Sequence, residues 1–298
     1  MAKVQTLGSQ QNYHESVQRV LIVILLLNLV VVIGKAVAGW FANSLTVLSD
    51  AIHSTVDMLN NVMGIVLIRY ASAPPDREHP YGHSKFETLG AFSVAGFLFI
   101  TCFEIAVHSL RQLFAVQNTL PDISPFTVIT MLATIAINLF VTTYEARRGR
   151  ELSSELLRAD AAHTRSDVYV SASVLLSFFF VSYGYGRIDA LFALGIALII
   201  AYNGYQLFRQ TVPILVDAAM LDPRRIEQIA LSLPGVYRCY NIRSRGRPGD
   251  LFIEMVVIVE SHNLIDAHAL TEKIEQALRQ EFGRAAITIH FEPTEATE

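Results

Sequence analysis

Two histidine–aspartate pairs lie inside apolar segments of this chain. His53 and Asp57 form one H-x-x-x-D pattern, and His163 and Asp167 repeat it further along. A spacing of four places each pair on one helix face, about 6 Å apart along the axis. Two such faces turned toward each other would offer two imidazoles and two carboxylates, a tetrahedral set that suits zinc. Because ionisable side chains inside a membrane span are costly, the pairs predict a metal ion handled within a membrane.

The neighbours of the first pair strengthen this interpretation. Asp50 lies on the same helical stripe as His53 and Asp57, and Asn60 and Asn61 continue the polar face. A single membrane histidine more often only hydrogen-bonds a neighbouring helix. Several acids and bases on one stripe, found in two segments, favour a metal site over that simpler alternative.

A second constellation lies in the polar stretch that follows residue 75. Asp76, His79 and His83 provide one carboxylate and two imidazoles within eight residues, and Pro80 and Gly82 allow the chain to turn around an ion. Such loops are often simply solvated. Beside an intramembrane His/Asp set, however, a second metal site is the better interpretation. A third and weaker group lies near the end of the chain: His268, His290 and Glu292.

The composition indicates a membrane protein. Of the 298 residues, 52% are hydrophobic and 17% are charged, and the mean hydropathy is +0.39. A span needs roughly 20 apolar residues. Six stretches meet this need, so we expect an all-α bundle of six transmembrane helices; the first is too long for a cleaved signal peptide. These stretches are residues 17–40, 45–70, 86–113, 125–144, 159–183 and 188–215.

The basic residues predict how the bundle is oriented. Arg77 and Lys85 follow the second stretch, and Arg147, Arg148 and Arg150 follow the fourth, whereas the connections on the other side carry fewer. The positive-inside rule then places both basic loops and both termini in the cytoplasm, in a multi-pass protein of the cytoplasmic (inner) membrane. The net charge of −4 gives no reason to expect a nucleic-acid partner, and two cysteines predict no disulfide framework.

From about residue 218 the pattern becomes that of a small soluble domain. Asp222 and Pro223 are typical of a helix start. Alternating stretches at 236–245 and 251–259 predict strands, 264–282 predicts a helix that stops at Gly283, and 286–291 a last strand. The order α-β-β-α-β indicates an α+β fold. We expect an N-terminal cytoplasmic segment (1–16), a transmembrane domain (17–215), a cytoplasmic domain (216–293) and a flexible tail (294–298).

Together these motifs resemble the cation diffusion facilitators, over nearly the whole chain. The resemblance implies a metallochaperone-like cytoplasmic domain, a homodimer, and export of divalent metal in exchange for protons. It matches the four H-x-x-x-D residues to the transport site and Asp76, His79 and His83 to a loop site. It also matches Lys85 and Asp217 to a charged pair that braces the dimer. The cytoplasmic site departs from the family, because Tyr240 and Val256 stand where bacterial zinc members carry histidine.

We therefore expect a zinc/proton antiporter in the lipid bilayer, with Zn²⁺ as the transported and bound ion. Another divalent metal, such as iron, cadmium, cobalt or manganese, is the alternative within this class. An enzyme is not expected, since H-E-x-x-H is missing and two histidines with two aspartates would fill the coordination sphere. A membrane-anchored metal sensor would leave the intramembrane ligands without a purpose.

Overall fold

The structure, a computed structural model, describes residues 2–41, 45–114, 125–182, 188–247, 249–260 and 263–294. Within these ranges some side chains, including those of His53 and Asp57, lie outside the described part. The chain divides into two compact units, Met1–Thr211 and Val212–Glu298.

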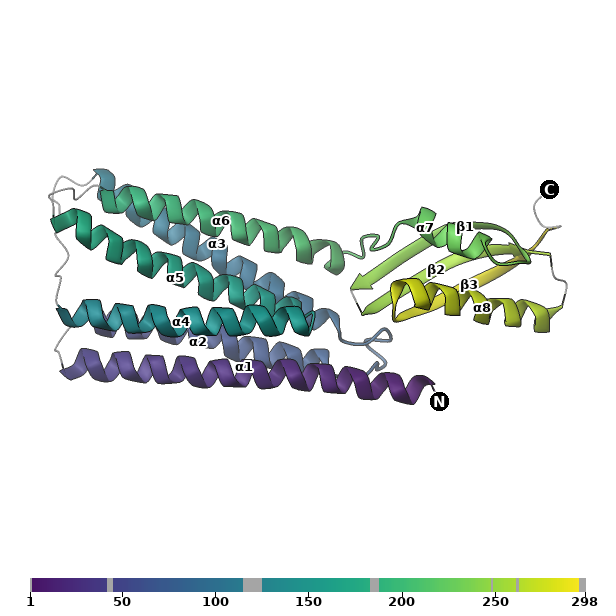
Figure 1. Cartoon of the computed structure of the whole chain (residues 1–298), viewed down its shortest axis with the longest axis horizontal. Helices are drawn as coiled ribbons and strands as arrows, with labels where there is room; N and C mark the ends of the chain where they lie inside the picture. Colours follow the sequence, from purple (N-terminus) through teal and green to yellow (C-terminus); the bar gives the residue numbers. More distant parts are fainter. Residues whose placement is uncertain are drawn as a thin grey trace. The chain divides into compact units, whose positions relative to one another are not determined.

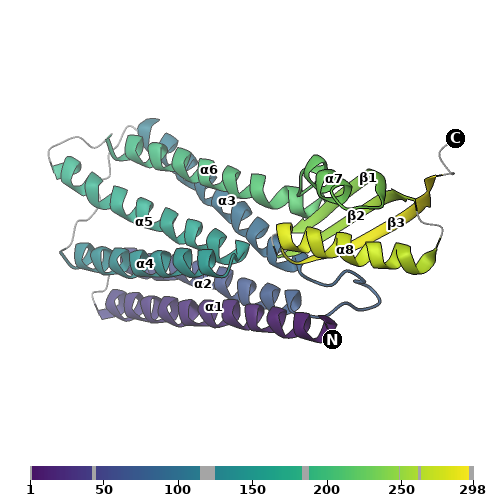
Figure 2. The same ribbon diagram turned by 45° about the vertical axis from the view of Figure 1, so that its right-hand side comes forward.

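The first unit is built from long helices that run side by side (Figures 1 and 2). Figure 1 also shows the N-terminus and the connections α2–α3 and α4–α5 at the same end of this bundle. These helices are α1 (Ala2–Phe41), α2 (Leu45–Ala71), α3 (Lys85–Phe114), α4 (Pro125–Glu151), α5 (Glu155–Ser182) and α6 (Ile188–Leu215).

Four of these helices contain stretches long and apolar enough to cross a membrane, namely Asn12–Val37, Lys85–Arg111, Val128–Glu151 and Ala190–Leu215. The two remaining long helices, α2 and α5, carry the His/Asp patterns. The expected helical membrane region is therefore confirmed. Helix α1 includes residues 2–16, where no proline interrupts a helix; the assignment of this segment to the cytoplasm stays a prediction.

Helix α5 is central to the packing of the bundle. Leu156 and Leu157 are buried in a cluster with residues of α1, α2 and α4. Ala159, less than one turn later, belongs to a second buried cluster with residues of α3 and α6. The helix that carries His163 and Asp167 is therefore held from several sides.

The second unit is the predicted α+β domain. Helix α7 (Pro223–Leu231) begins after Asp222, whose side chain accepts a hydrogen bond from the Arg224 backbone amide, and α8 (Leu264–Phe282) ends at Gly283. Strands β1 (Val236–Arg247), β2 (Asp250–Val259) and β3 (Ala285–Pro293) follow the expected order. Each of these elements was predicted from capping residues or alternation, and the fold class is confirmed.

The sheet has the strand order β1-β2-β3, with β1 antiparallel and β3 parallel to β2. Both helices bury an apolar face against it. Ile226 of α7 and Ile274 of α8 are 0% exposed and share one core with Ile253 and Val257 of β2. Figure 1 shows the helices α7 and α8 lying along the sheet.

Candidate metal-transport site

The start of α5 is fixed by a buried hydrogen-bond network. The Ser154 hydroxyl accepts a hydrogen bond from the Leu157 backbone amide, as an N-cap residue does. The same hydroxyl donates to Glu87 Oε1 at 2.6 Å, and Tyr13 Oη donates to that oxygen at 2.7 Å. Glu87 is 0% exposed. Helices α1, α3 and α5 therefore meet at one carboxylate.

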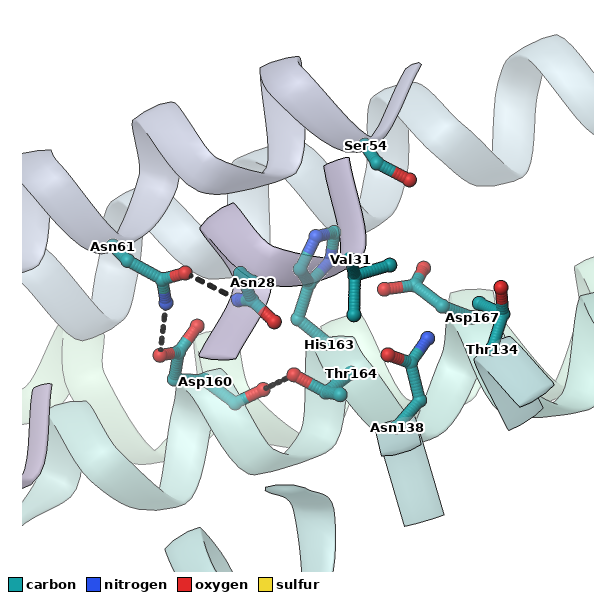
Figure 3. Close-up of a pocket in the computed structure, with 10 residues that line it drawn as sticks. All are labelled: Asn28, Val31, Ser54, Asn61, Thr134, Asn138, Asp160, His163, Thr164 and Asp167. Atoms are coloured by element: carbon teal, nitrogen blue, oxygen red, sulfur yellow. Dashed lines mark hydrogen bonds between the residues drawn. The ribbon is translucent and has the colours of Figure 1, made fainter. Parts of the chain in front are cut away.

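His163 and Asp167 line one polar pocket inside the bundle, as the sequence predicts for a pair spaced by four (Figure 3). His163 is buried, and its Nε2 lies 3.4 Å from the Asn60 amide nitrogen. Ser54, adjacent to His53 in α2, lines the same pocket. The side chains of His53 and Asp57 lie outside the described residues, so their place in the four-ligand site remains a prediction.

Helices α1 and α4 contribute to the pocket as well, which sequence reasoning missed. Asn28 and Val31 come from α1, and Thr134 and Asn138 from α4. The sequence does show Asn28 as an amide side chain within an apolar span. Polar residues at such positions point to function or to helix–helix contacts. No spacing rule, however, connects it with His163.

Lys35 also belongs to the surroundings of the site. It is only 5% exposed, and its Nζ donates a hydrogen bond to Ser54 Oγ at 2.9 Å. Since Ser54 lines the pocket, the Lys35 amino group lies beside the place where the cation is expected.

Towards the start of α5, the pocket is lined by a chain of amides and a carboxylate. Asn28 Nδ2 donates to Asn61 Oδ1, and Asn61 Nδ2 donates to Asp160 Oδ2, both at 2.7 Å. The Thr164 hydroxyl reaches the Asp160 carbonyl oxygen and, at 3.4 Å, Glu145 Oε2. Figure 3 shows Asn61 and Asp160 at one end of the pocket and Asp167 at the other, with His163 between them.

The predicted loop site is brought together by the structure. Asp76 Oδ1 lies 3.4 Å from His79 Nδ1, and Asp76 Oδ2 lies 3.4 Å from His83 Nε2. Across the described part of the chain, this is the one group of three histidine, cysteine or acidic residues whose ligand atoms lie within 4.8 Å of one another. Hydrogen bonds from the backbone amides of His79 and Glu78 hold the pKa of Asp76 below its usual value, which keeps the carboxylate ready for a cation.

The three residues of the predicted cytoplasmic site do not form a group whose ligand atoms all lie within 4.8 Å of one another, and the site stays a prediction. His268 lies on α8 beside Glu272, whereas His290 and Glu292 share one face of β3 with 3.9 Å between Nε2 and Oε1. The Tyr240 hydroxyl donates to Glu292 Oε2 at 2.6 Å, and this hydrogen bond raises the pKa of Tyr240. The Tyr240 phenol therefore holds one of the three expected ligands.

The predicted pair of Lys85 and Asp217 joins residues of different units and stays a prediction. Within its own unit, Asp217 lies 3.8 Å from Arg245 Nη1. Its backbone is in the left-handed region, with φ of 56°.

Comparisons with known proteins decide the family. The model of the cation efflux transmembrane domain matches residues 21–216, and the model of the cytoplasmic domain of cation efflux proteins matches residues 221–294. The chain belongs to the cation efflux family. The cation-efflux pump FieF of Salmonella arizonae is 30% identical over 286 residues, 95% of each chain. FieF of Yersinia pestis is 32% identical over 89% of this chain and 88% of that protein.

Membership in the cation efflux family confirms the resemblance that the motifs indicated. This cation efflux protein is a multi-pass membrane protein of a family that transports divalent metal cations. A solved structure of the zinc form of CzrB is 26% identical to it, covers 26% of this chain and 94% of the CzrB chain, and has a TM-score of 0.23.

Proposed function

We propose that the protein exports zinc from the cytoplasm in exchange for protons, with His53, Asp57, His163 and Asp167 as the transport ligands. One observation carries the proposal. A buried imidazole and a carboxylate of α5 line a polar pocket next to the α2 turn that bears His53 and Asp57. Membership in the family supports transport of a divalent cation, and the chemistry of the four ligands supports zinc as the metal.

Zinc is favoured by the chemistry of the four ligands. Imidazole nitrogen and carboxylate oxygen are both common zinc ligands, and four of them fill a tetrahedral sphere. Manganese and magnesium prefer sites made of oxygen. Iron, cadmium and cobalt remain the alternatives within the same site.

Exchange with protons follows from competition for the imidazoles. A histidine must be neutral to bind a metal, so zinc binding releases protons. Because imidazole titrates near neutral pH, a pH difference between the two faces of the membrane shifts this competition. We infer that zinc enters the deprotonated site from the cytoplasm and that protons from outside displace it.

The rest of the proposal concerns assembly and orientation. We infer that the protein is a homodimer, which the match to the cytoplasmic domain model supports. We place the basic ends of the bundle, with Arg147 and Arg148, in the cytoplasm by the positive-inside rule. Zinc bound by Asp76, His79 and His83 would then lie on the cytoplasmic side.

Zinc uptake into proteoliposomes under a pH gradient tests the transport site. We expect His163→Ala and Asp167→Asn to abolish flux, because removing a ligand opens the sphere and leaves polar groups unpaired. His108→Ala and Glu104→Gln are matched controls, since both residues lie on α3 with exposed side chains. Wild-type flux in either site variant would refute the ligand assignment, and flux that ignores the pH gradient would refute proton exchange.

Competition among metals tests the choice of zinc. We expect His53→Asp to widen transport toward cadmium or manganese, because a harder oxygen replaces a nitrogen ligand. An unchanged order of preference would place selectivity outside this residue. A protein that binds zinc but moves none would instead be a membrane-anchored sensor.

A further inference from the structure

Polar side chains join three helices of the bundle at one end of the pocket. Asn61 of α2 lies between the other two: it accepts a hydrogen bond from Asn28 of α1 and donates one to Asp160 of α5, both at 2.7 Å. Asn61 is 3% exposed and Asp160 is 4% exposed. Figure 3 shows the Asn61 amide reaching both partners. We call these three residues the amide clamp.

The clamp is compatible with only one orientation of its central amide. The Oδ1 atom of Asn61 accepts the hydrogen bond from Asn28, which leaves Nδ2 to donate to Asp160. A reversed amide would place its NH2 group against the Asn28 NH2 group and its oxygen against the carboxyl group, and both hydrogen bonds would be lost. The clamp therefore fixes how α5 lies against α2.

The clamp lies about one helical turn from each half of the predicted ligand set. On α2, Asn61 follows Asp57 by four residues, and on α5, Asp160 precedes His163 by three, which is about 5–6 Å along either helix. The adjacent Asn60 also reaches α5, where its amide nitrogen lies 3.4 Å from His163 Nε2. The spacing between α2 and α5 at the clamp is therefore carried over to the ligands.

A metal site divided between two helices depends on this spacing. Zinc binds nitrogen and oxygen ligands at about 2.0–2.2 Å, and a functional site must be held to within about 0.5 Å of its geometry. Each helix fixes the pair of ligands that it carries, but not the distance to the pair on the other helix. A buried hydrogen bond between the helices can fix that distance, because stretching it leaves buried polar groups unpaired.

We propose that Asn61 is a positioning residue: through the clamp it holds the α2 and α5 halves of the ligand set at the spacing that zinc requires, and so favours zinc over larger divalent ions. The inference rests on the proposed function, since it takes the four His/Asp residues as the ligands. Geometry adds here to the choice of metal made by ligand type. Without the clamp, a larger ion such as cadmium gains relative to zinc, because its longer bonds suit ligands that lie further apart.

Initial rates of zinc and cadmium uptake by the full-length protein in proteoliposomes test the proposal. Asn61→Leu removes both hydrogen bonds of the central amide and keeps a side chain of similar size. We expect the KM for zinc to rise about tenfold, the lower end of what outer partners of metal sites contribute, and the KM for cadmium to change much less. The zinc-to-cadmium ratio of kcat/KM should fall accordingly.

Thr88→Val is the matched control. Thr88 is 0% exposed, and its hydroxyl donates a hydrogen bond from α3 to Glu155 of α5 at 2.8 Å. Neither of these two residues lines the pocket. Thr88→Val therefore removes a buried hydrogen bond that holds the same helix, and it should lower thermal stability without changing the zinc-to-cadmium ratio.

Exchanging the two clamp side chains provides a second test, which holds if Asn61→Leu fails to fold. Asn61→Asp alone places two carboxyl groups against each other, and we expect it to lower the zinc-to-cadmium ratio as Asn61→Leu does. Combining Asn61→Asp with Asp160→Asn exchanges donor and acceptor, so that both hydrogen bonds of the clamp form again. The double variant should regain most of the wild-type ratio.

The outcomes separate the alternatives. An unchanged zinc-to-cadmium ratio in Asn61→Leu and Asn61→Asp overturns the positioning role. An equal loss for both metals, matched by Thr88→Val, also overturns it and assigns the clamp to folding alone. A folded double variant that remains as poor as Asn61→Asp shows that the hydrogen bonds do not carry the effect, and it too overturns the proposal. If the wild-type protein moves no zinc, or His163→Ala leaves the flux unchanged, the proposed function fails first, and this inference falls with it.

Discussion

The carboxylate of Glu87 offers the clearest quantitative test of how the bundle is held together. It accepts hydrogen bonds from Tyr13 at 2.7 Å and from Ser154 at 2.6 Å, and it is fully buried. Hydrogen bonds to charged groups contribute about 1.5–3 kcal/mol each. Because Glu87 lies in the first turn of α3, the favourable end of the helix dipole adds to its stabilisation.

Replacing Tyr13 by phenylalanine removes one of the two hydrogen bonds and keeps the ring. We expect the free energy of unfolding to fall by about 1.5–3 kcal/mol. Glu87→Gln keeps the shape but loses the charge, and charge-assisted hydrogen bonds are roughly twice as strong as neutral ones. In the double variant, the free energy of unfolding should fall by about 1–2 kcal/mol less than the sum of the two single effects, because both changes remove the same contact.

The measurement is a double-mutant cycle on the purified protein, with unfolding in detergent micelles followed as denaturant is added. Tyr169→Phe serves as control, because this exposed tyrosine lies on α5 at some distance along the helix from Ser154. If the effects of Tyr13→Phe and Glu87→Gln add to within about 0.5 kcal/mol, the two side chains are not coupled. One carboxylate would then not couple the three helices.

Three further predictions follow from single residues. Asp76→Asn should weaken zinc binding at the loop site by about 10–100-fold in calorimetry, while transport at saturating zinc persists. An unchanged zinc affinity would refute the loop site. Lys35→Met should tighten zinc binding by about tenfold or more and Lys35→Arg should not, because a positively charged side chain at this place repels the ion; weaker binding by Lys35→Met would contradict this. Gly246→Ala should lower the stability of the C-terminal unit by roughly 2–4 kcal/mol, since φ is +109° and the new Cβ would lie 2.3 Å from the Asp250 oxygen. Thermal melting compares Gly246→Ala with Gly249→Ala, where φ is +86° but no neighbouring atom lies within 4 Å of the new Cβ.

The elements of the C-terminal unit could be predicted closely, because local signals determine them. Asp222 and Pro223 mark where α7 begins, and Gly283 marks where α8 ends. The alternation of β2 predicts which side chains enter the core. The prediction was shorter than the structure only at strand ends, where pairing between strands decides how far each one extends.

The transport site could be predicted only in part, because its walls come from helices that share no sequence pattern. The H-x-x-x-D spacing predicted that His163 and Asp167 share one helix face, and both line one pocket. It gave no sign of Asn28 or Asn138, which line the pocket from α1 and α4, or of Lys35, which donates a hydrogen bond to a lining residue, Ser54. Helix–helix packing brings these residues together, and packing depends on contacts between positions far apart in the sequence.

The polar content of α5 has a consequence for how the protein enters the membrane during synthesis. This helix carries Glu155, Arg158, Asp160, Arg165 and Asp167 as well as its histidine. Each charged residue opposes insertion of an isolated helix by up to a few kcal/mol near its centre. Helix α4 precedes α5 directly and packs along it, so we expect the two to insert as one hairpin. The polar residues of α5, including the two predicted metal ligands, would then also fix the order in which the bundle assembles.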